Sequence, residues 1–546
     1  MNENETVNGS PAPGISSTPA LSGNNVAVQA NETTHAAVGS NDERALVSTE
    51  VSARPAITSR RPRIVLTGAT GYIGKNLLRQ LVRDYDVIAL SRHDRSEHNT
   101  EQVEWRACDL FSMSAAEEAL AGADYAIYLV HSMLPTAKLT QAKFEDMDII
   151  LADHFTRAAC KHGIKQIVYL SGIIPQNVPR EQLSRHLRSR LEVEQVLGSC
   201  GIPVTTIRAG LIVGPQGSSF PILARLVQRL PMMTLPEWTR TLTHPIALPD
   251  VLHALQQSIG SPQLYGRAID VGGPDIMTYK QMMEKTAQVM GKRRLFIDVP
   301  LLTIHLSRLW VTLVTRMPRE IVYPLVESLA HPMVAHENQF VKGISDGKIT
   351  FEQAARTALA EEAQQQHRSS QSTRASDSTD PKVSDVRSIQ RVILPDGKNA
   401  RWAGEYYMEW LGRFMPALVR TERVDEYRYQ VFLRFIGKPL LELTFSPERS
   451  DDKSAVYHIT GGVFARIKET HEGRLEFQQI PGTQECVIAI HDYMPSLPWF
   501  LYKYTQAKVH LIVMHAFGRH LLRLIARDRQ HKPGSNVPPL SSHRPS

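Results

Sequence analysis

The stretch from Arg63 to Gly74, RIVLTGATGYIG, constrains the fold more than any other part of the sequence. It begins with an uncharged, mostly β-branched run, which is the pattern of a strand buried on both faces of a parallel sheet. Glycines follow at positions 68, 71 and 74, and residues 75–84 have the apolar spacing of a helix. Strand, glycine turn and helix in this order predict a dinucleotide site, in which the helix N-terminus faces the pyrophosphate. The alternative interpretation is an ordinary strand-to-helix turn.

The region from 61 to 345 alternates short apolar strands with helical stretches, which is typical of a parallel sheet covered by helices on both faces. We therefore predict an α/β Rossmann domain, that is, a doubly wound parallel sheet. Within it, residues 277–345 are expected to form a helical subdomain on the substrate side. The strands are expected at 63–67, 86–90, 103–107, 125–130, 166–170, 204–213 and 268–271.

The predicted turn and the end of the second strand supply the first candidate cofactor contacts. The second strand ends in Ser91 and Arg92, where a cofactor with a free 2′-hydroxyl usually meets an acidic residue. An arginine suits a 2′-phosphate, so NADP(H) is the preferred cofactor and NAD(H) the alternative. Arg92 as a solvated surface charge is the competing interpretation. The candidate contacts in the turn are Gly68, Thr70, Gly71, Tyr72, Ile73 and Gly74.

Further candidate contacts lie at the carboxyl ends of the other strands, which face the ligand in open parallel sheets. Asp109 is expected near the adenine ring and is also a candidate cap for the helix at 112–121. Ser171 ends the fifth strand, where the nicotinamide is expected to arrive. The remaining candidates are Leu110, Val130, His131, Ser132, Arg208, Ala209 and Gly210.

Together these stretches resemble the atypical short-chain dehydrogenase/reductases, in particular the NmrA-like NAD(P)-binding group and a bacterial subgroup of it. The resemblance covers about 63–335 and, less specifically, 388–525. It implies a Rossmann fold and an NAD(P) cofactor, and a fused C-terminal domain without a settled role. The stretches that carry it are TGATGYIG (67–74), YLVHSM (128–133), SRHLRSRLEVE (184–194), TIRAGLIVG (206–214), GSSF (217–220), RLPMM (229–233), SRLWVTLVTRMPREIVYPLVESL (307–329) and PSLPWFLYKYTQAKVH (495–510).

The sequence departs from this family at the catalytic helix. Carbonyl-reducing members use a Tyr-x-x-x-Lys pair one helical turn apart, in which the tyrosine donates the proton. The corresponding residues here are His186 and Arg190, whose spacing keeps both side chains on one helix face. The predicted catalytic set is Ser171 holding the substrate oxygen, His186 donating the proton and Arg190 holding the ribose. Alternatively, both helix residues only position the cofactor, and catalysis is lost.

Three stretches of low complexity bound the folded regions. Residues 1–60 and 529–546 are expected to be disordered tails, and 346–387 a flexible linker. The second folded region, 388–528, begins with a helix at 402–415 and ends with a long helix near 497–527. Between them six short strands are expected, at 427–435, 440–445, 456–460, 463–469, 475–479 and 486–491. This order is similar to START-like helix-grip folds, an α+β arrangement that encloses an apolar cavity. A solid core is the alternative.

Charge and cysteine usage narrow the classes of partner. The formal charge of +7 is spread along the chain, and no basic face interleaved with aromatics predicts nucleic-acid binding. The four cysteines are far apart, and no basic and apolar leader opens the chain, so the cytoplasm is expected. Residues 299–330 are apolar but interrupted by charges, which suits an amphipathic cover over the substrate or docking at the inner face of the membrane. No metal site is predicted.

The leading functional hypothesis is hydride transfer from NADPH to a carbonyl, enone or quinone-like group on an apolar substrate. A second hypothesis is a non-catalytic NADPH sensor or assembly factor, favoured by the missing Tyr-x-x-x-Lys pair. A third is a lipid-binding carrier in which the cofactor is structural.

Overall fold

A computed structural model describes residues 60–132, 139–299, 303–371, 386–466, 473–496 and 504–531. The sequence predictions for the tail at 1–59, the linker at 372–385, the start of the last helix at 497–503 and the tail from 532 lie outside these residues.

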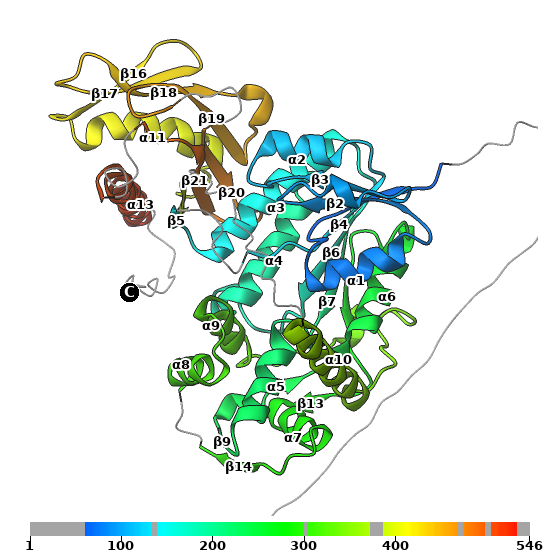
Figure 1. The fold of residues 1–546 in the computed structure, drawn as a ribbon. Coiled ribbons are helices and arrows are strands. Elements are labelled where there is room, and N and C mark those ends of the chain that lie inside the picture. Colours follow the sequence, from blue (N-terminus) through cyan, green and yellow to red (C-terminus); the bar gives the residue numbers. More distant parts are fainter. Residues whose placement is uncertain are drawn as a thin grey trace, which may run out of the picture. The chain divides into compact units, whose positions relative to one another are not determined.

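The first domain contains a seven-stranded sheet in which every strand is parallel to its neighbours. The chain switches direction across the sheet between β1 and β4, which is the position where open α/β sheets bind ligands. This confirms the predicted Rossmann fold (Figure 1). In spatial order the strands are β12 (Ala268–Val271), β7 (Val204–Ala209), β6 (Ile167–Gly172), β4 (Tyr125–Tyr128), β1 (Arg63–Leu66), β2 (Asp86–Ser91) and β3 (Val103–Ala107).

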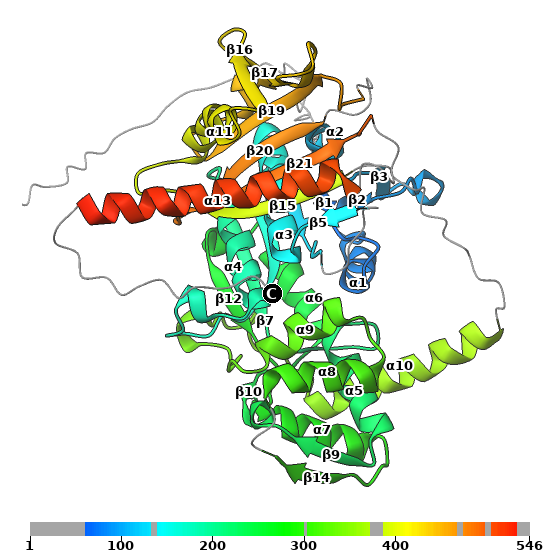
Figure 2. The ribbon, with the colours of Figure 1, turned by 90° about the vertical axis from the view of Figure 1, so that its left-hand side faces the viewer.

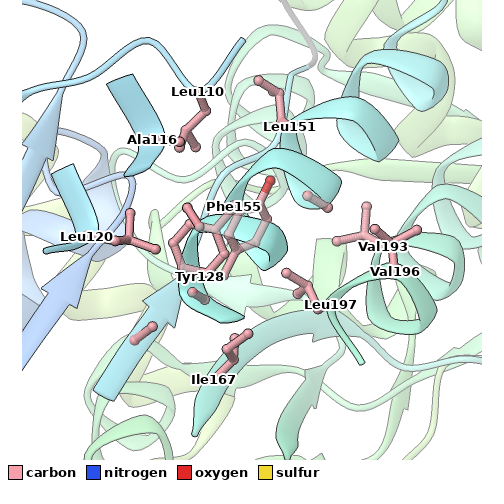
Figure 3. Close-up of a cluster of buried hydrophobic side chains, with 14 of the residues drawn as sticks. Leu110, Ala116, Leu120, Tyr128, Leu151, Phe155, Ile167, Val193, Val196 and Leu197 are labelled. Atoms are coloured by element: carbon pink, nitrogen blue, oxygen red, sulfur yellow. The ribbon is translucent and has the colours of Figure 1, made fainter. Parts of the chain in front are cut away.

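Alternate residues of the central strands pack against different sets of helices. Ile64 and Leu66 join the cluster of α1 (Tyr72–Leu81) and α6 (Leu248–Ser258). On the other face, Val65 joins the cluster of α2 (Met113–Leu120), α3 (Phe144–Lys161) and α4 (Arg185–Leu197). Figure 3 shows this second cluster, where Phe155 of α3 packs on Tyr128 at the centre.

The helical subdomain on the substrate side has a hydrophobic core of its own. It draws on more of the sequence than the predicted 277–345, because α5 and β9 also contribute buried residues. Its main elements are α5 (Ser219–Arg229), β9 (Met232–Leu235), α7 (Tyr279–Val289), β14 (Leu295–Asp298), α8 (Ile304–Thr315) and α9 (Arg319–Ser328). Two small sheets of two-residue strands also form in this part of the chain: β8 (Ile212–Val213) pairs with β11 (Ile246–Ala247), and β10 (Leu242–Thr243) pairs with β13 (Met277–Thr278).

The predicted linker at 346–387 contains a helix, so the prediction is wrong for its first half. Helix α10 spans Phe351–Gln371. Its first turns place Phe351, Ala354, Ala355 and Ala358 in the core of the helical subdomain. These positions follow the spacing of one helical face, which the glutamine- and serine-rich composition of the segment obscures.

The second domain is an eight-stranded sheet that is antiparallel except at one edge. Five of the six strands predicted there are present. The sixth, expected at 463–469, is not a strand over 463–466, and its remainder lies outside the described residues. In spatial order the strands are β16 (Val419–Arg423), β17 (Arg428–Leu433), β18 (Pro439–Phe445), β19 (Ser454–Gly461), β20 (Arg474–Gln479), β21 (Glu485–Tyr493), β15 (Val386–Ile393) and β5 (Leu139–Gln141).

Two helices, α11 (Ala400–Phe414) and α13 (Gln506–His531), share a hydrophobic core with this sheet. Aromatic rings fill the space between them, since Tyr407 lies 5.0 Å from Phe517 and 5.8 Å from Phe477 between ring centres. The packing supports a solid core at this point. The domain is an antiparallel sheet with a long terminal helix, and its predicted resemblance to START-like folds is not supported. By length and composition α13 is apolar enough to cross a membrane, although its inner face is packed on the sheet.

Helix α3 is shared by the two domains. Ile389, Val487 and Ala489 of the C-terminal sheet belong to the same hydrophobic cluster as α3. In addition, β5 lies in the sequence between β4 and α3 of the first domain, yet it pairs with β15 of the second. Residues 139–141 are therefore built into the edge of the C-terminal sheet (Figure 2).

Candidate active site

A cavity of about 670 Å³ runs from the glycine turn to the helical subdomain. One end is lined by backbone of the turn and of the first residues of α1. The other end is apolar. Its wall includes Trp238, Tyr279, Met283, Val311, Leu325 and Met333. A cavity that is polar at one end and apolar at the other suits a polar cofactor beside an apolar substrate.

The glycine turn has the backbone geometry that a dinucleotide site requires. Gly68 has a φ of +65°, which favours glycine, and a Cβ on Gly74 would collide with the carbonyl of Gly68. Helix α1 begins at Tyr72 without a side-chain cap, so its first N–H groups are free to bind an anion. Gly68, Gly71, Tyr72, Ile73 and Gly74 line the cavity, whereas Thr70 does not. The turn therefore fits a pyrophosphate.

Four polar side chains meet in the middle of the cavity: Ser171, His131, His186 and Arg190. Ser171 ends β6, His131 follows β4, and the other two lie on α4. In each of them one buried atom has no hydrogen-bond partner among the described residues. These atoms are Ser171 Oγ, His131 Nε2, His186 Nδ1 and Arg190 Nη1. Because buried polar atoms are normally paired, this group is suited to a ligand.

His131 is held by a buried carboxylate that the sequence analysis missed. Its Nδ1 lies 2.6 Å from Oδ2 of Asp148 on α3. Asp148 also accepts hydrogen bonds from the backbone N–H of Ser132 (2.7 Å) and from the hydroxyl of Ser189 (3.2 Å). Burial raises the pKa of Asp148, but His131 and Arg190 outweigh it, and the pKa lies below its usual value. Asp148 is thus a carboxylate that can stabilise an imidazolium at His131.

His186 differs from its predicted role as the proton donor. Burial lowers its pKa well below 6.5, and the positive charges of His131 and Arg190 lower it further. The ring is therefore neutral at neutral pH and has no acidic proton to give. Its centre lies 5.0 Å from that of His131, so it forms the wall beside the other histidine.

Arg190 is fixed against the strand that carries Ser171. Its Nη2 donates to the carbonyl of Leu170, and its guanidinium lies 4.9 Å from the ring centre of Tyr169. The other terminal nitrogen, Nη1, has no hydrogen-bond partner among the described residues, and Arg190 is part of the cavity lining. Its role of holding the ribose stays a prediction.

Arg208 does not line the cavity, in contrast to Ala209 and Gly210. Its guanidinium pairs with the Glu194 carboxylate through two contacts, of 2.7 and 3.1 Å, and reaches Gln339 at 3.2 Å. Because Glu194 belongs to α4, Arg208 fixes the helix that carries His186 and Arg190. It is a positioning residue.

The candidates for the adenosine end lie outside the cavity lining. Ser91 is buried at the end of β2, and Arg92 beside it is exposed. Asp109 accepts from the backbone of Phe111, while Ser112 itself caps α2, so the predicted cap at Asp109 is wrong. Leu110 is buried in the core, Val130 packs against it, and Ser132 contributes its backbone N–H to Asp148.

The sequence analysis missed Asp148 because nothing local distinguishes it. It lies in the middle of α3, a helix in which Glu145, Asp146, Asp153 and His154 are also buried. Such a density of charged residues on an apolar helix was the available signal, since charges are rarely buried without partners.

A second buried cluster contains His154 of α3 with Glu476 and His491 of the C-terminal sheet. Glu476 Oε2 lies 2.9 Å from Nε2 of both histidines. The arrangement has the residue types of a metal site, but the guanidinium of Arg474 lies 3.2 Å from both Glu476 and His491. A cation is therefore already in place, and we interpret the cluster as an ion-paired contact between the domains.

Comparison with known proteins supports the cofactor class. Residues 68–224 match a family model described as NAD(P)H-binding, and this part of the chain is an NAD(P)H-binding domain. Auxiliary protein GraX from Staphylococcus aureus is 31% identical over 127 residues. That match covers 23% of this chain and 41% of GraX, so the chain spans less than half the length of this relative.

Two solved structures are similar to about half of the chain. The NADPH-dependent quinone oxidoreductase QOR2 from Escherichia coli, complexed with NADPH, is 18% identical with a TM-score of 0.44, covering 54% of this chain and 99% of that one. The triphenylmethane reductase from Citrobacter, complexed with NADP(H), is 16% identical with a TM-score of 0.43, covering 54% and 100%.

Proposed function

We propose that this protein is an NADPH-dependent reductase that reduces a carbonyl, enone or quinone group on an apolar substrate. The observation that carries the proposal is the continuous cavity, in which an uncapped helix N-terminus and an apolar chamber are joined by four side chains with unpaired polar atoms. A bound nicotinamide supplies a hydride.

The residues of this chain supply the proton and the orientation. The imidazolium of His131 donates its Nε2 proton to the substrate oxygen, and Asp148 keeps the proton on Nδ1. Ser171 donates a second hydrogen bond to the same oxygen. Hydride and proton together complete a two-electron reduction, with one new C–H bond and one new O–H bond. His131 then recovers its proton from solvent.

Arg190 takes the place of the family's lysine. Arg190 lines the cavity and its Nη1 has no hydrogen-bond partner among the described residues, so this nitrogen can hold a ribose hydroxyl or the carboxamide. An arginine does not lose its proton, so it orients and does not relay. The proton route therefore lies at His131 on the β4 side.

Substitution of the two histidines tests this assignment. We expect His131→Gln to lower kcat for an apolar benzoquinone about 10²- to 10³-fold. The matched variant, His186→Gln, should lower kcat less than about tenfold, because a neutral wall residue supplies no proton. Calorimetric titration with NADPH should give similar affinities for both variants and the parent. Equal losses in the two variants would contradict the role of His131, and NADPH binding without turnover of any carbonyl, enone or quinone would contradict the reductase.

The preference for NADPH over NADH rests on the exposed Arg92 at the end of β2. We expect Arg92→Asp to lower the ratio of NADPH to NADH affinity about tenfold or more, because the 2′-phosphate loses its cation. Arg83→Asp, at another exposed arginine, is the control and should leave the ratio unchanged. An unchanged ratio in Arg92→Asp would contradict the preference.

A non-catalytic NADPH sensor is the second candidate, favoured by one observation. Strand β5, at 139–141, pairs with β15 of the C-terminal sheet and lies a few residues after His131 in the sequence, so a change at the cofactor could be passed to the second domain. The matched relative GraX is named an auxiliary protein. The sensor predicts that NADPH slows amide exchange in β15 in a protein that shows no turnover, whereas the reductase predicts turnover with or without that change.

A further inference from the structure

Helix α8 has one face toward the cavity and one toward solvent. Ser307, Val311 and Thr315 are buried, and Val311 lines the cavity. Leu306, Leu309 and Leu313 are 53%, 57% and 76% exposed. Their spacing places these three leucines in a single stripe along the outside of the helix. An apolar face on the solvent side of a helix indicates an interaction surface.

A second group of exposed apolar residues lies on β9 and β14. Met232 of β9 and Leu295 of β14 are paired in register, and both are more than half exposed. Arg229, just before β9, donates to the carbonyl of Val314 and so ties this strand pair to the end of α8. Figures 1 and 2 show α8 beside α9, and β9 and β14 at the end of the helical subdomain that is farthest from the seven-stranded sheet. We call the five exposed residues Leu306, Leu309, Leu313, Met232 and Leu295 the α8 surface.

The charge around the α8 surface is positive. The sequence from 299 to 319 contains no acidic residue, and Arg316 and Arg319 at its end are exposed. Arg229 and Arg293 are exposed beside Met232 and Leu295. The acidic neighbours are paired, since Glu327 binds Arg308 at 2.7 Å and Glu320 binds Arg319 at 3.1 Å. Exposed leucines rimmed by arginines match the apolar interior and anionic headgroups of a bilayer surface.

We propose that the α8 surface docks on an anionic membrane, and that the apolar substrate reaches the cavity from the bilayer past α8. This deepens the proposed function, on which its substrate claim rests, because it makes the substrate lipid-soluble. Helix α8 spans Ile304–Thr315, which is too short to cross a bilayer, so the helix lies in the interface. A second copy of the chain would oppose arginines to arginines and supply no carboxylate from this stretch.

Vesicle flotation of the full chain tests the docking without any need for turnover. We expect the protein to float with vesicles of phosphatidylglycerol and phosphatidylcholine at low salt, and weakly with phosphatidylcholine alone. The double variant Leu309→Glu/Leu313→Glu should bind at least tenfold more weakly, and Arg316→Glu about fivefold more weakly. The matched control is Phe435→Glu, on a residue 82% exposed between β17 and β18, and it should bind like the parent.

Three outcomes would overturn the proposal. The first is that the parent does not bind anionic vesicles, and the second is that the double leucine variant binds them as well as the parent. The third is that the parent sediments as a dimer, the double variant sediments as a monomer, and vesicles do not change the sedimentation of either. NADPH titration of the same variants distinguishes a failure of the membrane-docking proposal from a failure of the proposed reductase function. A double variant that binds NADPH and reduces a water-soluble quinone like the parent, but not a quinone embedded in vesicles, supports the docking. A parent that binds vesicles but reduces neither quinone would contradict the reductase and leave the docking standing.

Discussion

Two buried histidine–carboxylate clusters lie on different faces of helix α3. They contain similar side chains, but one lies at the cavity and the other at the contact between the domains. Asp148 holds His131, whose other nitrogen is unpaired and lines the cavity. His154 has both nitrogens engaged, with Leu110 and Glu476 at 2.9 Å each, and it is closed to solvent. The first cluster lies at the cavity, whereas the second lies away from it and its charged groups are ion-paired with one another, although Arg474 Nε, Glu476 Oε1 and His491 Nε2 make no hydrogen bond among the described residues. Access, and not residue type, separates a site from a structural contact.

The largest expected effect comes from breaking the closed cluster. Glu476→Gln removes the charge that His154, His491 and Arg474 share, and it leaves the buried guanidinium of Arg474 with Asp492 as its remaining carboxylate partner. We expect a loss of about 3–5 kcal/mol in the free energy of unfolding, measured by urea titration. Glu405→Gln removes an exposed pair with Arg401 and should cost less than about 1 kcal/mol. Similar losses in the two variants would mean that the cluster does not hold the domains together.

Breaking the open cluster should affect catalysis more than folding. Asp148→Asn keeps the shape of the side chain but removes the charge that stabilises the His131 imidazolium. We expect kcat to fall about 10²-fold, while the NADPH dissociation constant changes less than about threefold. The stability loss should be smaller than that of Glu476→Gln. If Asp148→Asn instead lost stability and NADPH affinity together, Asp148 would be a purely structural residue.

The smallest effect, and the sharpest contrast, is in the pH dependence of stability. Burial lowers the pKa of His186, so below pH 6.5 the unfolded chain binds a proton that the folded chain does not, and stability falls. For His491 burial also lowers the pKa, but Glu476 outweighs it and the pKa is raised. Its contribution is complete below pH 6.5 and is lost as the pH rises through the raised value.

Histidine replacements should therefore shift the stability profile in opposite directions. Below pH 6.5, His186 lowers the free energy of unfolding by up to about 1.4 kcal/mol per pH unit, and we expect His186→Asn to abolish this decrease. In the parent, His491 stabilises the fold below pH 6.5 and stabilises it less as the pH rises. We expect His491→Asn to abolish this stabilisation. Urea titrations between pH 5.5 and 8 measure both. Parallel profiles for the two variants would contradict the contrast between the clusters.

The cofactor half of the site could be predicted from the sequence because its determinants are local. The strand, the three glycines and the helix lie within one short stretch, and Ser171 directly ends a recognisable strand. The catalytic half could not be predicted in the same way. His131 and Asp148 meet across β5 and the start of α3, and His186 lost its expected role through burial that its own neighbours in the sequence do not reveal.

The contact between the domains was beyond local reasoning for the same physical cause. His154 and Glu476 are far apart in the chain, and each alone looks like a solvated polar residue on its element. Helix α10 is a different case, because Phe351, Ala354, Ala355 and Ala358 carry the helical period openly. There the composition of the segment outweighed its periodicity, and the periodicity was the better guide.

The pairing of β5 with β15 also has a consequence during synthesis of the chain. The ribosome releases β5 together with the first domain, long before β15 exists, so the nascent protein carries an unpaired strand a few residues after His131, the proposed proton donor. The active site is therefore among the last parts of the molecule to mature, although its residues are among the first to be translated. A messenger RNA truncated before the codon for residue 386 would yield a chain with a folded Rossmann domain and an unpaired strand, β5, that is prone to aggregate.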